Sequence, residues 1–181
     1  IQDAAFEKCR SLAEVVTGDK ITSIGNSAFS GCSNLANFEW SASLESIGDY
    51  AFANANKITV VEFPSTVTNL GARAFSECNL LQKVTLSDNI EEIKEYTFYK
   101  CKALEEVHFP TALKKVGQFA FEYSGLKSAV LPEQLTQIES AAFENCSSLE
   151  KVVLNSTIEE FTWGVFAYGS PLAELTINAP L

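Results

Sequence analysis

A phenylalanine returns at a nearly constant interval along the whole 181-residue chain. Successive members are 23 residues apart, apart from one step of 22, and we call them the spine phenylalanines: Phe6, Phe29, Phe52, Phe75, Phe98, Phe121, Phe143 and Phe166. A fixed period of this length is typical of proteins in which each repeat forms one coil that cannot bury its own apolar side. The coils must stack on one another, so the sequence predicts a solenoid with one continuous core.

Further apolar columns keep the same register as the spine phenylalanines. An aliphatic residue stands eight positions before most of them and a large apolar residue stands five positions before, as Leu44 and Ile47 precede Phe52. Glycine often follows the second of these columns, where the lack of a Cβ suits a bend or a close approach of two backbones. It does so at Gly25, Gly48, Gly71 and Gly117, whereas Lys94, Glu139 and Thr162 take its place in other units, Thr162 after Phe161.

Alternating apolar residues after each spine phenylalanine predict a β-strand in every unit. Val84-Thr85-Leu86 and Val107-His108-Phe109 are apolar at their first and third positions, which is the period of a strand with one buried face. One strand per coil builds a parallel β-sheet, and the segment around each Ala-Phe pair predicts one helical or 3₁₀ turn opposite it. We therefore predict an α/β repeat solenoid of about eight 23-residue turns, forming a single domain over residues 1–181.

The repeat unit resembles the leucine-rich repeat subclass found in BspA-like surface proteins of bacteria and some protists. The residues that carry the resemblance in one unit are Leu104, Val107, Phe109, Pro110, Leu113, Val116, Gly117, Ala120 and Phe121. The resemblance implies a right-handed leucine-rich repeat coil in a secreted or cell-surface protein, often associated with adhesion. The chain opens within a unit and carries no signal peptide, so we expect a segment of a longer or processed surface protein.

Charge and composition argue against several classes of partner. The net charge of −10 disfavours nucleic acid, because phosphate binding needs a basic stripe, and it equally disfavours docking on anionic lipid. No uninterrupted apolar run approaches the roughly 18 residues of a membrane span, so we expect no direct membrane insertion. No Asp-x-Asp-x-Asp calcium loop is present, and we expect no cofactor.

The five cysteines share one position in the repeat, three residues after a spine phenylalanine. Ala55, Ser124 and Gly169 fill this position in other units, which indicates a small-residue packing site. Some of the cysteines lie on adjacent coils, but equivalent side chains stacked in parallel rarely have the dihedral angle of a disulfide. Zinc is disfavoured because no Cys-x-x-Cys or Cys/His cluster exists. We therefore predict free, buried thiols at Cys9, Cys32, Cys78, Cys101 and Cys146.

The single histidine forms no convincing catalytic group. His108 is the middle residue of a predicted strand and should point outward, while Cys101 should point inward, so the two cannot pair. A Ser-His-Glu group can be drawn from Ser87, His108 and Glu106, but it lacks a nucleophile elbow and an oxyanion site. We predict that the protein is not an enzyme; an enzyme or metal protein would instead show a deep pocket beside His108 or a bound ion.

Outward-facing strand positions form the predicted binding surface on a concave sheet. Rigid columns of side chains are the usual means by which solenoids contact a protein, so we expect an extracellular recognition or adhesion module. Its partner would be a protein or glycan on host matrix or neighbouring cells, bound by a monomer. Exposed β-branched residues also suit a strand that binds nothing, so the alternative is a non-binding structural spacer. The candidate binding residues are Glu39, Glu62, Lys83, Thr85, Glu106, His108, Val130, Lys151 and Val153.

Overall fold

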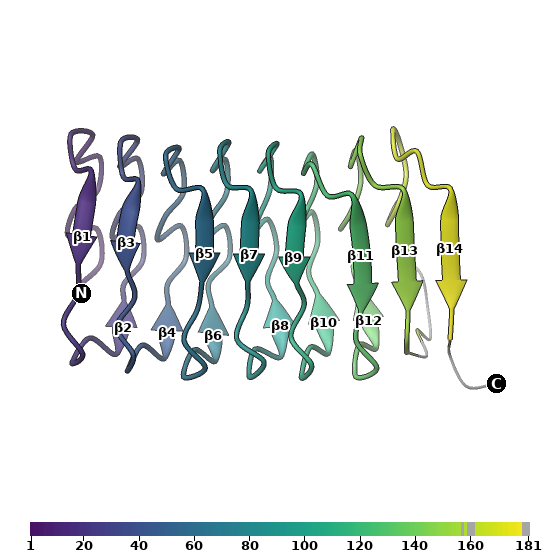
Figure 1. The fold of residues 1–181 in the computed structure, drawn as a ribbon, viewed down its shortest axis with the longest axis horizontal. Coiled ribbons are helices and arrows are strands. Elements are labelled where there is room, and N and C mark those ends of the chain that lie inside the picture. The colour runs from purple at the N-terminus through teal and green to yellow at the C-terminus, as the bar shows by residue number, and fades with distance from the viewer. Residues whose placement is uncertain (157, 159–161, 179–181) are drawn as a thin grey trace.

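The structure, a computed structural model, describes residues 1–156, 158 and 162–178 as one coil wound around a long axis (Figure 1). The predicted residue Phe161 lies outside this part of the chain. In Figure 1 the front strands run downward and the fainter strands behind them run upward while the chain advances from left to right, so the coil is right-handed. It makes about seven turns, not about eight, because the eight spine phenylalanines enclose only seven steps.

The first six turns each contribute one long and one short strand, on opposite sides of the coil (Figure 1). The long strands have three or four residues and are β1 (Glu14–Val16), β3 (Asn37–Glu39), β5 (Val60–Glu62), β7 (Lys83–Thr85), β9 (Glu106–His108), β11 (Ser128–Leu131), β13 (Lys151–Leu154) and β14 (Glu174–Ile177). The short strands have two residues and are β2 (Ser23–Ile24), β4 (Ser46–Ile47), β6 (Asn69–Leu70), β8 (Glu92–Ile93), β10 (Lys115–Val116) and β12 (Gln137–Ile138). Long strands pair with long strands and short strands with short strands. All of these pairings are parallel, as the sequence predicts.

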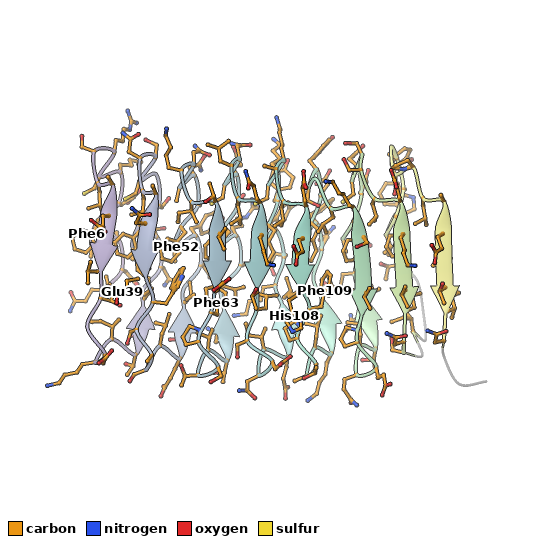
Figure 2. The ribbon with its side chains drawn as sticks, viewed as in Figure 1. Phe6, Glu39, Phe52, Phe63, His108 and Phe109 are labelled. Atoms are coloured by element: carbon orange, nitrogen blue, oxygen red, sulfur yellow. The ribbon has the colours of Figure 1, made fainter. Side chains whose placement is uncertain are left out.

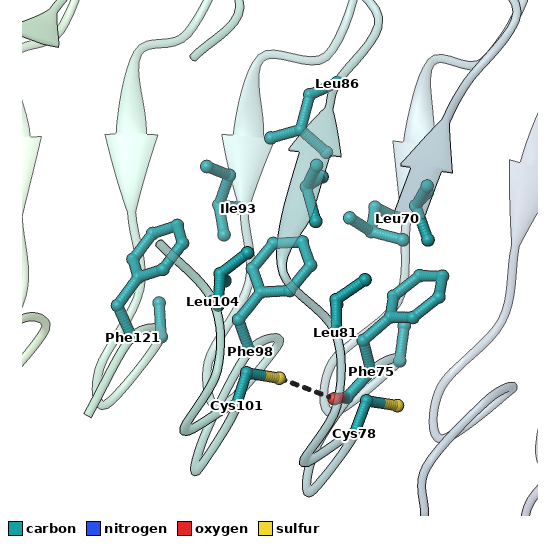
Figure 3. Packing of buried hydrophobic residues seen from close by; sticks show 14 of the residues in the cluster. Leu70, Phe75, Cys78, Leu81, Leu86, Ile93, Phe98, Cys101, Leu104 and Phe121 are labelled. Atoms are coloured by element: carbon teal, nitrogen blue, oxygen red, sulfur yellow. Dashed lines mark hydrogen bonds between the residues drawn. The ribbon is translucent and has the colours of Figure 1, made fainter. Parts of the chain in front are cut away.

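The core is a continuous column between the two rows of strands. Its centre is the predicted stack of phenylalanines, in which the ring centroids of Phe52 and Phe75 lie 5.2 Å apart and their planes differ by 7°. The spine phenylalanines from Phe29 to Phe143 are fully buried. Figure 3 shows how Leu81 and Leu104 pack beside this stack on successive coils. Burial of each ring contributes about 1.5–3 kcal/mol, so the spine is a main source of cohesion between coils.

The segment around each spine phenylalanine is not helical, contrary to the prediction. The angle φ is positive two residues before and two residues after it, as at Tyr50 (58°) and Asn54 (61°) around Phe52, and residues in this conformation do not propagate a helix. The Phe52 N–H also donates to the Ala74 carbonyl on the next coil, at 2.8 Å, and the Asn54 N–H donates to Ser76 at 2.9 Å. Stacking therefore uses backbone groups that a helix would retain, and the described residues form a parallel β-solenoid without helices.

Both rows of strands are interrupted, which the repeat pattern does not predict. The long strands form three sheets, β1-β3, β5-β7-β9 and β11-β13-β14, and the short strands form two, β2-β4-β6 and β8-β10-β12. Figure 1 shows the two wider spacings in the front row, between β3 and β5 and between β9 and β11. Where two adjacent coils are unpaired in one row of strands, the same two coils are paired in the other row. Adjacent coils therefore remain joined on at least one side.

The break between β6 and β8 occurs where the glycine column is interrupted. A Cβ added to Gly48 would lie 2.6 Å from the backbone nitrogen of Asn26, so coils approach closely at this column, as predicted. The Gly71 N–H donates to the coil before it, to Ile47, at 2.8 Å, but Lys94 makes no equivalent bond. Glu139 keeps its bond, at 2.9 Å, so a side chain in this column is accommodated at one coil contact and accompanies a break at another.

The cysteine prediction is correct for four of the five thiols. Cys32, Cys78, Cys101 and Cys146 are buried, and all five cysteines are free. The buried thiols donate to phenylalanine carbonyls, as Cys101 does to Phe75 at 3.1 Å (Figure 3). Cys9 is exposed instead, because among the described coils its own coil packs against another on one side only.

Candidate binding surface

Strand pairing aligns the predicted residues of the middle coils in two straight columns. The residue between the columns on β7, Val84, is fully buried, so the side chains of the columns point to solvent. His108 lies on this face of the solenoid, as Figure 2 shows. One column contains Val60, Lys83 and Glu106, and the other contains Glu62, Thr85 and His108.

An ion pair occupies the first of these columns. The Lys83 ammonium nitrogen lies 2.9 Å from a Glu106 carboxylate oxygen. The hydrogen bond to Glu106 raises the pKa of Lys83, so the Lys83 ammonium group stays charged near neutral pH. Both side chains remain largely exposed, at 43% and 66%, and pairs this exposed contribute little to stability. The arrangement therefore leaves both groups available to a partner.

A second cluster of predicted residues lies on the C-terminal coils. Val130 and Val153 are strand partners, and Val130 is 55% exposed. Lys151 lies beside them and its ammonium nitrogen is 2.6 Å from a Glu174 oxygen. Val130 and the half-buried Val153 together give this part of the face an apolar character. The structure thus divides the predicted residues into two clusters, separated by the break between β9 and β11.

Glu39 is the one predicted residue that joins neither cluster. Its strand pairs with β1, where its partner is Val16, and the break after β3 separates it from Glu62. A depression of about 350 Å³ lies here, lined by residues of β1, β3 and β5 that include Glu14, Phe38 and Val60. Sequence reasoning missed Glu14 and Val16 as surface residues. They stand eight and ten positions after Phe6, so the 23-residue period was sufficient to find them.

His108 has a carboxylate neighbour but no nucleophile. Its Nε2 lies 3.7 Å from an Asp88 oxygen. The Thr111 N–H donates to Asp88 at 2.9 Å and lowers the pKa of that carboxyl group. Ser87 is buried, and its hydroxyl donates to the Ser65 carbonyl at 3.1 Å. The Ser-His-Glu group drawn from the sequence is therefore not assembled, because Ser87 is directed into the turn between coils.

Residues 1–156, 158 and 162–178 contain no group of three or more His, Cys, Asp or Glu side chains placed to hold a metal ion. The same part of the chain has no helix of the length and apolarity that crossing a membrane requires.

A family model described as a BspA type leucine rich repeat region, with six copies, matches residues 1–90 and 68–181. Among curated proteins, none matches the chain.

Solved structures of bacterial leucine-rich repeat proteins have the same fold. A leucine-rich repeat protein from Eubacterium ventriosum is 18% identical with a TM-score of 0.72, over 87% of this chain and 44% of that one. The T. pallidum leucine rich repeat protein is 22% identical with a TM-score of 0.57, over 82% and 70%. The pneumococcal vaccine antigen PcpA is 21% identical with a TM-score of 0.52, over 100% and 60%. Two further bacterial structures also match, and the chain spans 64% and 62% of their lengths.

Proposed function

Because this chain belongs to the BspA-type leucine-rich repeat family, we propose that it is an extracellular recognition or adhesion module that binds a protein or glycan and performs no catalysis. Recognition uses the outward columns of the long strands, which we call the long-strand face. A location at the cell surface is supported by the family and by the likeness to a pneumococcal vaccine antigen.

The observation that carries the proposal is the exact strand register of polar and apolar side chains over a rigid core. Glu62, Thr85 and His108 follow one another on successive coils, and Val130 and Val153 do the same further along. Their backbones are anchored by inward residues of the same strands that are buried or, on β9, partly buried, so little conformational entropy is lost when a partner binds. The outward valine pair, of which Val130 is exposed, lies beside charged columns and provides the apolar and polar contacts that a protein interface combines.

One observation favours a structural spacer that binds nothing. The ion pairs Lys83–Glu106 and Lys151–Glu174 join neighbouring coils along the long-strand face. These charges already satisfy one another, as expected of a surface that only has to remain soluble. Recognition and spacing therefore differ in one measurable property, which is saturable binding at this face.

The test is binding of the purified protein to an array of extracellular-matrix proteins and glycans. A triple variant, Glu62→Lys, His108→Ala and Val153→Glu, alters the long-strand face. Its control, Glu45→Lys, Gln137→Ala and Thr68→Glu, makes the same charge changes at exposed positions in or next to the short strands. Recognition predicts saturable binding that the first variant loses and the control retains, with unchanged circular dichroism in both. Equal binding by all three proteins would place recognition away from the long-strand face, and binding by none of them would favour the spacer.

A further inference from the structure

The break between β3 and β5 opens the long-strand face at one defined place. No backbone hydrogen bond joins residues 36–40 to residues 59–63, all of which the structure describes. At the next coil contact the Gln82 N–H donates to the Thr59 carbonyl at 2.8 Å, and the first coil contact has the equivalent bond from Ala36 to Ala13 at 2.9 Å. The facing edges of β3 and β5 therefore carry backbone donors and acceptors with no partner among the described residues, and such groups require hydrogen-bond partners.

Two large side chains, one on β3 and one directly after it, account for the opening. Phe38 and Trp40 occupy inward positions where the next coil has Val61 and Phe63. The ring of Trp40 lies 4.5 Å from Phe38 and 5.1 Å from Phe63, measured between centroids. An overfilled layer forces backbone shifts, and here the shift separates the strands. Phe38 remains partly exposed, although Val61 is fully buried.

The depression at this break is acidic and its lining contains no basic residue. Glu14 and Glu39 line it on the same face, and Glu62 lies two residues beyond the lining residue Val60. Within the described residues, neither Glu14 nor Glu39 has a cation at ion-pair distance, whereas Lys83 and Lys151 each have a carboxylate partner. Exposed Val16 and Val60 flank these carboxylates, at 70% and 48%.

We propose that the break between β3 and β5 is the docking site for an extended peptide segment of a protein partner, which places an arginine side chain in the depression between Glu14 and Glu39. This proposal rests on the proposed function and names the partner that one part of the long-strand face recognises.

Arginine matches the groups present better than other side chains do. Its planar guanidinium group has five N–H donors and no acceptor, and the depression offers carboxylate oxygens and unpaired carbonyls. It binds carboxylates in a bidentate manner and stacks on aromatic rings, and Phe38 lines the site. Apolar residues beside the arginine would contact Val16 and Val60. An extended backbone would also pair with a free strand edge, as in β-strand addition.

The experiment is an NMR titration of the ¹⁵N-labelled protein with the peptide Ac-Thr-Val-Arg-Val-Thr-NH₂. The control peptides carry citrulline or glutamate in place of arginine. Citrulline keeps the shape and several donors but removes the charge. We expect saturable amide shifts at residues 14–16, 36–40 and 59–62, with about tenfold weaker binding of the citrulline peptide, which corresponds to one charge-assisted contact. A double variant, Glu14→Gln and Glu39→Gln, should weaken the arginine peptide to a similar extent.

Control variants separate this site from general acidity. Glu45→Gln removes an exposed carboxylate on the other side of the coil and should leave the titration unchanged. Absence of saturable shifts up to about 5 mM peptide, beyond the millimolar range of a weak contact, would overturn the proposal. Equal binding of the arginine and citrulline peptides, or equal effects of Glu45→Gln and the double variant, would also overturn it.

The outcome is independent of the test of the proposed function. Array binding that is lost with Glu62→Lys, His108→Ala and Val153→Glu but kept with Glu14→Gln and Glu39→Gln supports recognition by the long-strand face. In that case, a failed peptide titration shows that the break is not the docking site. A positive titration together with a negative array supports the docking site and shows that the array did not contain the partner.

Discussion

Phe75→Ala should be among the most destabilising single substitutions in the chain. The Phe75 side chain is fully buried and its ring stacks between Phe52, at 5.2 Å, and Phe98, at 5.9 Å. Loss of the transfer free energy of the ring costs about 1.5–3 kcal/mol. The cavity between coils brings the expected loss to about 3–5 kcal/mol, which is a large part of the roughly 5–15 kcal/mol of a typical domain.

Phe6→Ala is the matched control, because it makes the same chemical change at the end of the same stack. Phe6 is 43% exposed and stacks on Phe29 alone, so we expect a loss of about 1 kcal/mol. The measurement is urea unfolding followed by circular dichroism, with both variants compared to the parent protein. A difference below about 1 kcal/mol between the two variants, when about 2 kcal/mol or more is expected, would refute the view that the continuous spine holds the coils together.

Three further predictions follow from close contacts and buried thiols. Gly71→Ala should destabilise the folded protein by about 1–3 kcal/mol, because its new Cβ would overlap the backbone of the preceding coil. Gly18→Ala is the control, since a Cβ there meets nothing within 4 Å, and equal melting temperatures of the two variants would contradict the close approach at Gly71. At pH 8 a thiol reagent should modify Cys9 rapidly and the other four cysteines only on unfolding, so a second fast-reacting thiol in the native protein would contradict their burial. Burial raises the pKa of Cys78 from 9.0 to about 12. The unfolded chain therefore loses this proton first, and the stability that the neutral thiol contributes is present below about pH 9 and lost as the pH rises toward 12. Urea unfolding between pH 8 and 11 should show a shallower decline of stability for Cys78→Ala than for the parent protein, and parallel declines would contradict the link.

Sequence reasoning located the core and the surface columns because both follow from periodicity. An interval of 23 residues places equivalent residues above one another, and strand alternation then assigns Val84 to the core and Thr85 to the surface. The same argument predicted that Cys101 is buried. It failed for Cys9, because a repeat pattern treats every coil alike, although the coil of Cys9 has a described neighbour on one side only.

The turn around each spine phenylalanine was predicted wrongly because local composition does not determine it. Ala, Phe and Tyr in 48–53 are compatible with a helical turn, yet Tyr50 adopts a positive φ of 58°. This conformation is uncommon for a bulky residue. It becomes favourable only when the next coil accepts the N–H groups that it directs outward, as Ala74 does for Phe52 at 2.8 Å. Such bonds join residues 22 apart in sequence, so no local pattern reveals them.

The candidate binding surface divides in the same way between sequence and structure. The sequence by itself determined that the chain is a stacked coil, which residues face inward, and that Glu62, Thr85 and His108 form a column, because all of these follow from a period that every unit shares. Only the tertiary structure decided where the sheets break, and hence that Glu39 lies beside Glu14 at an open depression and not beside Glu62. The physical reason is that a break depends on how Phe38 and Trp40 fill the space between two coils, and that volume is a property of the packed coils together.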